Sequence, residues 1–478
     1  MKSPTTSRHG FALLVLLGLV LQLMPFDLAS AQSGGNLDLR RNVIAGGGNT
    51  STGGGNLEIS GTAGQAAAGV QTTGGPVTQL GGFWSAMLGG TIPPAPGPGI
   101  LQFSSATYNT LEDCAGTVIT VTRSNGSTGT VTVNYATSDG SAQQRTDYES
   151  RLGTLTFAEG VTSMNFIVLT TRDAYVEGQE SINLALSNPA GGATLGNQST
   201  ATVIIGDNAV PNLQPIDDVT TFVCQHYHDF LNRQPDASGL AFWTNEITSC
   251  GNDPACNELK RINVSASFYL SIEFQQTGFL IERLYKAAYG NADGISNFGG
   301  THQVKVPMIR LSEFLADTQQ IGQNVVVRQP GWEMVLEDNK QAFVADFVQR
   351  SRFTTAFPTS MTPAQFVDTL NANCGNPLSP SNRNQLVNEL ATNSKTRAQV
   401  LRAVAEDPNL MGAEFNTAFV LMQYFVYLRR NPNDPQDTDY TGYDFWLTKL
   451  NQFNGNFVNA EMVKAFLTSI EYRTRFAP

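Results

Sequence analysis

The chain has 478 residues, a formal net charge of −11 at pH 7 and 41% hydrophobic residues. This length exceeds what one hydrophobic core organises, so we expect about three domains. The acidic balance argues against nucleic acid as a partner, because proteins that bind it present basic faces. The charge is compatible with cation binding, although a solvated acidic surface would also produce it.

The first 31 residues have the three parts of a secretory signal peptide. Lys2 and Arg8 form a short basic stretch, residues 11–24 are apolar, and the segment ends in Ala29-Ser30-Ala31. The apolar run is shorter than the roughly 20 residues of a membrane-spanning helix, and no later segment is long and apolar enough to span a bilayer. We therefore expect residues 1–31 to direct export, and the rest to be secreted, extracellular or at the cell surface.

Residues 33–90 are rich in Gly, Ser and Thr. This composition is typical of a flexible linker, but the alternating stretch at 56–60 equally fits a small β segment with glycine turns. The segment resembles Gly-rich stretches of bacterial secreted proteins that end in Gly-Gly-Phe-Trp, here at 81–84. The proline-rich residues 91–99 predict a semi-rigid linker at a domain boundary.

Residues 100–208 predict an antiparallel β-sandwich. Apolar and polar residues alternate with period two, and turn residues interrupt the pattern roughly every 8–12 positions. Val131, Val133 and Tyr135 share one face and would pack one sheet on the other. The expected strands are 103–110, 116–123, 129–137, 153–157, 163–171, 181–187 and 200–205.

After residue 212 the apolar spacing changes to that of helices, so residues 218–478 predict a mostly α-helical domain. Thr362 and Gln365, with Pro363 between them, predict one helix start.

Two parts of this region repeat the same residues in the same order. We infer two related helical units, and we expect structural ion pairs of Arg233 with Glu273 and of Arg430 with Glu471. The matching elements are 226–235, Gly239, Phe242-Trp243 and 271–274 in the first unit, and 423–432, Gly442, Phe445-Trp446 and 469–472 in the second.

The five cysteines all lie in the part that we expect to be exported, where disulfides form. Cys250 and Cys256 bracket a short loop with Gly and Pro, and we expect them to be bridged. The count is odd, so one thiol should stay free or pair elsewhere. Cys114 is the candidate for it, and Cys224 with Cys374 is an open pairing.

Catalytic motifs such as Gly-x-Ser-x-Gly, His-Glu-x-x-His and the Walker loop do not occur in the sequence. We therefore expect a protein without enzymatic activity, and a glycan-active enzyme in the helical half is the alternative. His226 and His228 make zinc a rival to calcium as the bound metal, but no Cys-x-x-Cys pair accompanies them.

Strand parity places most acidic residues of the sandwich at one pole. Successive antiparallel strands run to opposite ends, so alternate connections meet at the same end. Carboxylates held close together repel one another unless a cation lies among them, and calcium prefers oxygen ligands. Solvated acids that cap turns are the alternative. The connections at this pole contain Glu112, Asp113, Asp139, Asp147, Asp173, Glu177, Glu180 and Asp207.

The motifs of residues 100–208 resemble the Calx-beta domain family and follow its order, at 129–142, 147–148, 153–157, 177–180, 186–189 and 201–207. The resemblance implies an immunoglobulin-like sandwich that binds calcium at one pole. By position, its ligands would be Glu112, Asp139, Asp173, Glu177, Glu180 and Asp207. The family often has paired acids where this chain has Asp173-Ala174 and Asp207-Asn208. Fewer carboxylates predict one or two weak sites with a structural role.

Residues 218–476 are similar to a bacterial domain-of-unknown-function family, number 4214, through their Tyr-x-x-x-Leu-x-Arg, Gly-x-x-Phe-Trp and Ser-x-Glu-Phe/Tyr elements. That family has no assigned chemistry, so the resemblance implies only helical character and a place in secreted and surface proteins. A looser similarity to phycobilisome linker domains implies scaffolding.

Together these features predict a secreted or cell-surface interaction or adhesion protein, with a weak calcium-binding module and a helical region that binds an extracellular protein or glycan. The alternative is a purely structural envelope or matrix component that binds no metal.

Overall fold

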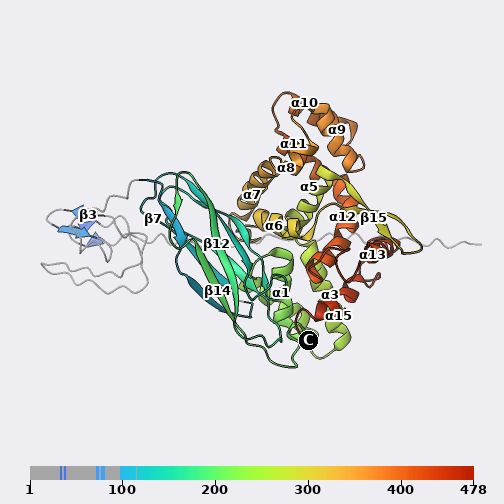
Figure 1. Ribbon diagram of the computed structural model, residues 1–478, viewed down its shortest axis with the longest axis horizontal. Helices are drawn as coiled ribbons and strands as arrows, with labels where there is room; N and C mark the ends of the chain where they lie inside the picture. The colour runs from blue at the N-terminus through green and yellow to red at the C-terminus, as the bar shows by residue number, and fades with distance from the viewer. Residues whose placement is uncertain (1–32, 35–36, 39–70, 75–76, 81–96, 115) are drawn as a thin grey trace, which may run out of the picture. The chain divides into compact units, whose positions relative to one another are not determined.

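The computed structural model describes residues 33–34, 37–38, 71–74, 77–80, 97–114 and 116–478. The predicted signal peptide lies outside the described residues, as does most of the Gly-rich segment. Within that segment, β1 (Ser33–Gly34) pairs with β2 (Leu37–Asp38), and β3 (Gln71–Gly74) pairs with β4 (Val77–Leu80), both antiparallel. The chain separates into two compact units, Met1–Pro93 and Pro94–Pro478, and the second contains both a β-sandwich and the helices (Figure 1).

The sandwich consists of two five-stranded sheets, with strand orders β10-β8-β12-β14-β6 and β13-β5-β7-β11-β9. Only β6 with β14 and β5 with β13 pair in parallel among the described strands of the sandwich. The predicted β-sandwich is therefore confirmed. The strands are β5 (Ile100–Phe103), β6 (Thr107–Leu111), β7 (Thr117–Ser124), β8 (Val131–Asp139), β9 (Tyr148–Glu149), β10 (Leu152–Phe157), β11 (Ser163–Thr170), β12 (Glu180–Ala190), β13 (Thr194–Leu195) and β14 (Thr200–Gly206).

The prediction of a single strand at 103–110 is wrong. The chain leaves one sheet after β5 and enters the other at β6, so residues 104–106 change sheets instead of continuing a strand. Elsewhere the alternation holds. Val131, Val133 and Tyr135 are buried, and the Tyr135 ring stacks on Phe166 with a centroid distance of 4.0 Å. Each fully buried side chain of this kind contributes roughly 1.5–3 kcal/mol.

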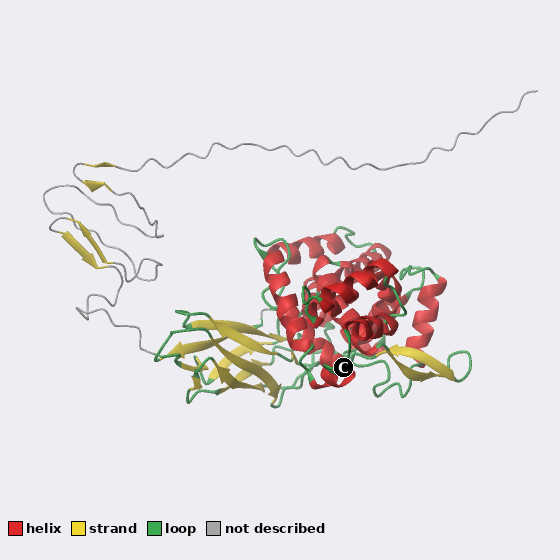
Figure 2. Ribbon diagram, turned by 90° about the horizontal axis from the view of Figure 1, so that it is seen from above, coloured by secondary structure: helices red, strands yellow, loops and turns green. Residues whose placement is uncertain are grey.

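The C-terminal half is mostly helical, as predicted, and Figure 2 shows its helices gathered beside the sandwich. None of the helices in the described part of the chain is long and apolar enough to cross a membrane. The helices are η1 (Pro215–Asp217), α1 (Val219–Leu231), α2 (Ala237–Thr248), α3 (Pro254–Leu270), α4 (Ile272–Gln276), α5 (Gly278–Tyr289), α6 (Leu311–Ile321), α7 (Trp332–Phe347), α8 (Ser351–Ala356), α9 (Pro363–Asn373), α10 (Pro380–Ala391), α11 (Arg397–Ala405), α12 (Pro408–Met422), η2 (Gln423–Tyr427), α13 (Thr441–Gln452), α14 (Met462–Leu467) and α15 (Ile470–Arg473).

Local sequence explains where several helices begin. The predicted start at Thr362 is confirmed by a capping box. The backbone amide of Gln365 donates to the Thr362 side chain, and the backbone amide of Thr362 donates to the Gln365 side chain. A hairpin, β15 (Asn291–Ser296) with β16 (His302–Pro307), interrupts the helices and was not predicted. Its turn contains Gly299 and Gly300, both with positive φ.

The two related units share one type of ion pair. In the first, Arg233 donates from Nε and Nη2 to the two carboxylate oxygens of Glu273, at 2.6 and 2.8 Å. In the second, Arg430 makes the same two-pronged contact with Glu471. The predicted ion pairs are confirmed. Each pair ties the end of one helix to a later helix of its own unit.

Buried charges join the sandwich to the helical half, at an interface that we call the seam. Arg429 forms an ion pair with Glu149 of β9 across the seam. Beside it, within the helical half, Nη2 of Arg475 lies 3.0 Å from Oδ1 of Asp229, a residue of α1. All four side chains are at most 8% exposed. Burial alone would raise the pKa of Asp229, but Arg475 and Arg429 hold it below its ordinary value. Breaking such a buried pair costs about 3–5 kcal/mol, because one charge remains uncompensated.

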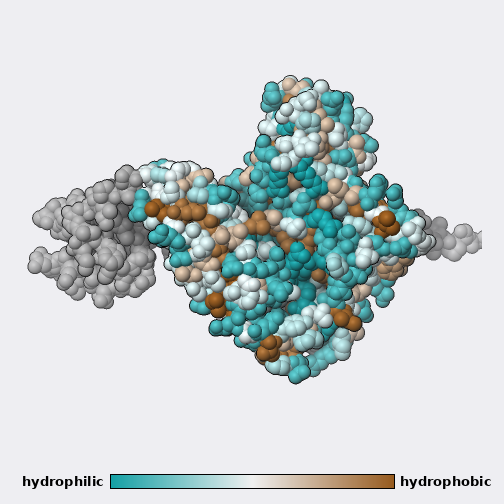
Figure 3. Space-filling model, in the orientation of Figure 1, coloured by the Kyte–Doolittle hydropathy of each residue, from teal (hydrophilic) through white to brown (hydrophobic). Residues whose placement is uncertain are grey.

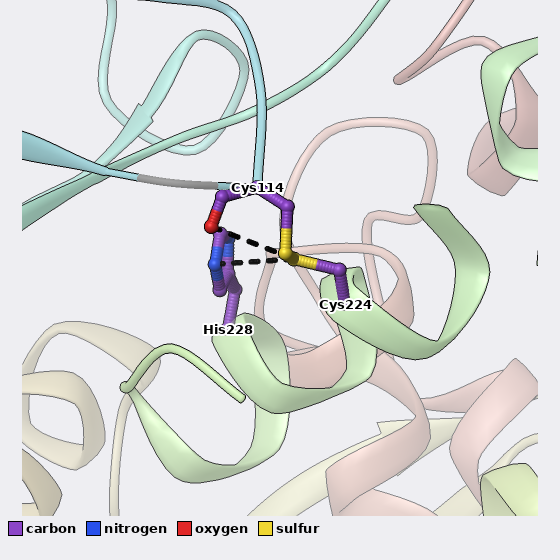
Figure 4. A group of neighbouring side chains, drawn as sticks. All are labelled: Cys114, Cys224 and His228. Atoms are coloured by element: carbon purple, nitrogen blue, oxygen red, sulfur yellow. Dashed lines mark hydrogen bonds between the residues drawn. A yellow bond between two sulfur atoms is a disulfide. The ribbon is translucent and has the colours of Figure 1, made fainter. Parts of the chain in front are cut away.

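A disulfide between Cys114 and Cys224 reinforces the seam (Figure 4). The expectation that Cys114 stays free is therefore wrong, and the free thiol is the buried Cys374. Cys114 follows β6 and lies against α1, with a Cα–Cα distance of 5.9 Å to Cys224. Such a pairing depends on docking between distant segments, which spacing in the sequence does not reveal. Cys250 and Cys256 form the second disulfide.

The two disulfides should contribute very differently to stability. Residues 114 and 224 are 110 apart in sequence, and residues 250 and 256 are 6 apart. Loop-closure entropy then predicts a loss of about 5 kcal/mol for Cys114→Ser with Cys224→Ser, against about 2 kcal/mol for Cys250→Ser with Cys256→Ser. Denaturant unfolding of the two double variants measures the difference. Equal losses would contradict a stapling role at the seam.

Candidate metal centre

Four connections of the sandwich bring six carboxylates to one end, which we call the acidic pole. They follow β6, precede β9, link β11 to β12, and follow β14. Three of these connections also contact the helical half, so the pole is built next to the seam. The acidic pole consists of Glu112, Asp147, Asp173, Glu177, Glu180 and Asp207.

The carboxylates of the pole form two groups that share one residue. Glu112, Glu177 and Glu180 place one oxygen each within 4.8 Å of one another, and so do Asp147, Asp173 and Glu177. Glu177 is exposed, whereas Glu112 and Asp173 are buried. The groups therefore extend from the solvent into the sandwich, with Glu177 at the outer side of both.

Glu112 is a buried carboxyl whose charge no donor among the described residues compensates. Its side chain is 1% exposed, and neither carboxylate oxygen has a hydrogen-bond partner within the part of the chain that the structure describes. Burial, followed by the charges of Asp173, Asp207 and the neighbouring glutamates, raises its pKa to about 8. A buried carboxyl without donors is costly unless a proton or a cation neutralises it.

Two further carboxyls of the pole also have raised pKa values. Burial raises the pKa of Asp173 to about 7, even though the Tyr175 amide donates to its Oδ1 at 2.9 Å. Burial and the charge of Asp147 raise the pKa of Glu180 to about 7. The pole thus holds several acids that neither salt bridges nor hydrogen bonds from the described residues fully compensate.

Asp207 has a different role, because its carboxylate oxygens accept hydrogen bonds from backbone amides. The amides of Glu177 and Gly178 donate to Oδ2 at 3.0 and 2.9 Å, and that of Ala209 donates to Oδ1 at 2.7 Å. These bonds hold the pKa of Asp207 below its ordinary value. Asp207 consequently fixes the loop that carries Glu177.

The structure does not bring Asp139, one of the expected ligands, into either group. Its Oδ1 accepts from Tyr148 Oη at 2.7 Å and from the Gln144 amide at 2.9 Å, so it closes the turn after β8. Asp147, from the same connection, lies in the group instead. Strand parity had placed Asp147 at this pole, but the ligand set that was assigned by position in the Calx-beta family did not include it.

The donor set consists of carboxylate oxygens, which suits calcium or another hard cation. The two pairs of acidic residues expected from the family are each reduced to one acid, since Ala174 and Asn208 occupy the second positions. Ala174 is buried, and its amide donates to the carbonyl of Phe476 at 2.8 Å. This position therefore serves the docking of the C-terminal residues.

The two histidines are not arranged as ligands of the alternative metal, zinc. His226 uses both ring nitrogens, at 2.7 Å from the Phe222 carbonyl and 2.6 Å from Ser265 Oγ. His228 lies with Cys114 and Cys224, but their sulfurs form the disulfide and offer no thiolate (Figure 4). Burial lowers the pKa of both histidines to about 4, so they are neutral packing residues.

The comparisons with known proteins agree with this geometry. Residues 97–209 match the family model of the Calx-beta domain. The Calx-beta domain is thus the part of the chain that carries the acidic pole, and the match ends before α1.

Among curated relatives, sodium/calcium exchanger 1 of Bos taurus is 32% identical over 141 residues, which cover 26% of this chain and 14% of the exchanger. Adhesion G-protein coupled receptor V1 of Danio rerio is 37% identical over 116 residues, covering 24% of this chain and 2% of the receptor. The chain therefore spans a small fraction of these relatives. Among solved structures, the apo-form Calx CBD1 domain is 31% identical and covers 23% of this chain and 96% of that domain, with a TM-score of 0.22.

The raised pKa values predict an unusual pH dependence for the metal-free protein. Folding shifts the pKa of Glu112 from 4.5 to about 8, so between these values the folded state holds a proton that the unfolded state has released. Stability should therefore fall as pH rises from 5 to 8, where many proteins are most stable. Chemical unfolding of metal-stripped protein across this range measures the slope.

Glu112→Gln should make that slope shallower, because glutamine does not titrate. Glu159→Gln, between β10 and β11 at the acid-poor end, is the matched control and should leave the slope unchanged. A slope that is the same with and without Glu112 would contradict the assignment.

Proposed function

We propose that this protein is an exported, non-enzymatic interaction protein whose Calx-beta domain binds calcium with low affinity at the acidic pole. The observation that carries the proposal is the buried Glu112, whose two carboxylate oxygens have no partner among the described residues and lie beside Glu177 and Glu180. A cation would compensate these charges. The matched relatives include sodium/calcium exchangers, which supports calcium as the ion.

Two sets of residues would hold the ion. Glu112, Glu177 and Glu180 form one set, and Asp147 and Asp173 join Glu177 in the other. Glu177 would serve both. Low affinity follows from the donor count, because three carboxylates supply only part of the 6–8 oxygens that calcium takes. Asp207 contributes by fixing the loop, since its oxygens are already engaged by backbone amides.

Export and partner binding rest on the sequence. The basic, apolar and small-residue parts of residues 1–31 support a signal peptide. The resemblance of residues 218–476 to the domain-of-unknown-function family 4214 supports a place at the cell surface or outside the cell, and a partner there that is a protein or a glycan. The lack of known catalytic motifs in the sequence supports a binding role for the helical half.

A structural role without metal is the second candidate, and one observation favours it. The loop between Asp173 and Glu177 is held by the last residues of the chain, since the Tyr175 hydroxyl donates to the Thr474 carbonyl at 2.7 Å. With pKa values of about 7 to 8, Glu112, Asp173 and Glu180 can also hold protons near neutral pH. Protonation and loop docking could together stabilise the pole without an ion.

Calcium titration separates the two candidates. If the pole binds calcium, the melting temperature of the full chain should rise with calcium, and a concentration tenfold above Kd should add about 1.4 kcal/mol of stability. The gain should be larger at pH 8 than at pH 6, because the ligands must lose their protons before they bind. Differential scanning calorimetry with calcium or with chelator measures both effects.

Glu177→Gln should abolish most of this gain, since Glu177 belongs to both groups. Asp139→Asn is the matched control, because Asp139 belongs to neither group and its asparagine replacement can still accept from Tyr148. An unchanged melting temperature in millimolar calcium at pH 8 would leave the structural role as the function of the pole.

A further inference from the structure

A cavity of about 410 Å³ lies in the seam, away from the acidic pole. The sandwich contributes Val118, Arg151 and Ile167 to its wall, and the helical half contributes Asn232, Gln319 and Val325. Its volume falls within the range of small-molecule sites in proteins. The wall combines apolar side chains with several polar ones, and Arg233 of the helical half also lies in it.

Arg151 brings a positive charge to this cavity and forms no salt bridge with a carboxylate among the residues that the structure describes. Its Nη2 donates to the Asn232 carbonyl at 2.5 Å, and its Nε is buried without a partner in the described part of the chain. Glu149 is close enough to act on its charge but forms its ion pair with Arg429. Burial lowers the pKa of Arg151, so the cation is held at a cost that an anion would relieve.

Asn232 brings an acceptor to the same cavity. The residue is 7% exposed, its Nδ2 donates to Thr318 Oγ1 at 3.1 Å, and its Oδ1 has no partner among the residues that the structure describes. Two residues of the cavity wall thus carry a polar atom without a partner among the described residues, a donor on a cation and an acceptor on a neutral amide. A ligand that satisfies both must carry an anionic oxygen and a hydrogen-bond donor.

A second cavity, of about 850 Å³, lies next to the first. Tyr135, Gln319 and Gln323 line both. Gln319 also holds the sandwich in place between them, because its amide donates to the Ser150 carbonyl at 2.6 Å and accepts from the Leu152 amide at 3.2 Å. Figure 3 shows the surface indented between the sandwich and the helices α7–α11, on the side of this larger cavity.

We propose that the seam cavity binds a hydroxy-carboxylate, with the carboxylate on Arg151 and a hydroxyl donating to Asn232 Oδ1. A sugar acid has both groups on one ring, and a ring of this kind fits the smaller cavity. It could be a free acid or one residue of an acidic glycan, whose next residues would lie in the larger cavity. This inference does not depend on calcium binding at the pole, because none of the six acidic residues of the pole lines either cavity.

Calorimetric titration of the full chain with D-glucuronate, D-glucose and a glucuronate-containing tetrasaccharide tests the proposal. We expect glucuronate to bind and glucose, which lacks the carboxylate, to bind at least tenfold more weakly. Tighter binding of the tetrasaccharide than of the free acid would identify a glycan as the source, and equal binding would identify the free acid. Repeating the titrations with chelator and with calcium separates this site from the pole.

Two variants of the cavity and one control complete the test. Arg151→Gln should weaken glucuronate binding by about tenfold or more, because a charge-assisted hydrogen bond is lost. Asn232→Asp should abolish it, since the new carboxylate would pair with Arg151 and repel the ligand. Aspartate tolerates the left-handed backbone of this position, where φ is 51°, so the fold should survive. Arg383→Gln on α10, which removes a partner of Asp368 on α9, should change nothing.

Three results would overturn the proposal. They are no binding of glucuronate or the tetrasaccharide by the unaltered chain, equal binding of glucose and glucuronate, and unchanged glucuronate binding by the folded Asn232→Asp variant.

Discussion

A cluster of buried charges at the seam, in which Arg429 pairs with Glu149 of the sandwich, is the constraint on which the rest of the structure depends. Arg429 and Arg475 reach carboxylates on the sandwich and on α1 in surroundings from which water is excluded. Because an unpaired charge there would cost several kcal/mol, the sandwich and the helices have one preferred way of docking. That docking has two consequences for function. It ties the loop between Asp173 and Glu177 to the C-terminal residues, and it creates the cavities beside Arg151.

The two candidate sites use opposite electrostatic arrangements of the same domain. At the pole, acids accumulate until burial and mutual repulsion raise their pKa values towards neutrality. At the seam cavity, Arg151 forms no salt bridge with a carboxylate of the described residues, because its neighbour Glu149 is paired with Arg429. If the two proposals hold, a cation would compensate the pole and an anion would compensate the seam cavity, by separate contacts.

Features that follow from local periodicity could be predicted from the sequence. Strand parity brought Glu112, Asp173 and Glu180 to one end, because antiparallel strands must alternate in direction. The internal repeat predicted the pairs Arg233–Glu273 and Arg430–Glu471, because two copies of one fold repeat their contacts. The positional comparison with the Calx-beta family chose Asp139 over Asp147, and only the turn geometry decides between them.

The contacts at the seam could not be predicted from such patterns. Arg151 and Asn232 are 81 positions apart, and Cys114 and Cys224 are 110 apart. Each of these contacts joins two segments whose periodicities are satisfied within their own domains. Nothing in either segment signals the other, because the docking is specified by shape and by a few charges spread over the whole chain. The expectation for Cys114 failed for this reason, and the cavity had no counterpart in the sequence.

The Cys114–Cys224 disulfide also determines how the molecule would respond to tension. A pull applied between residue 97 and the C-terminus would pass from residue 114 directly to residue 224 through the sulfur atoms, bypassing the intervening chain. Strands β7 to β14 and the connection to α1 lie inside this covalent loop, so the load would not extend them. Among the described elements, β5, β6, the hairpin β15–β16 and the helical residues after 224 would bear it. A protein built this way could let its helices unravel under shear while the acidic pole keeps most of its loops intact.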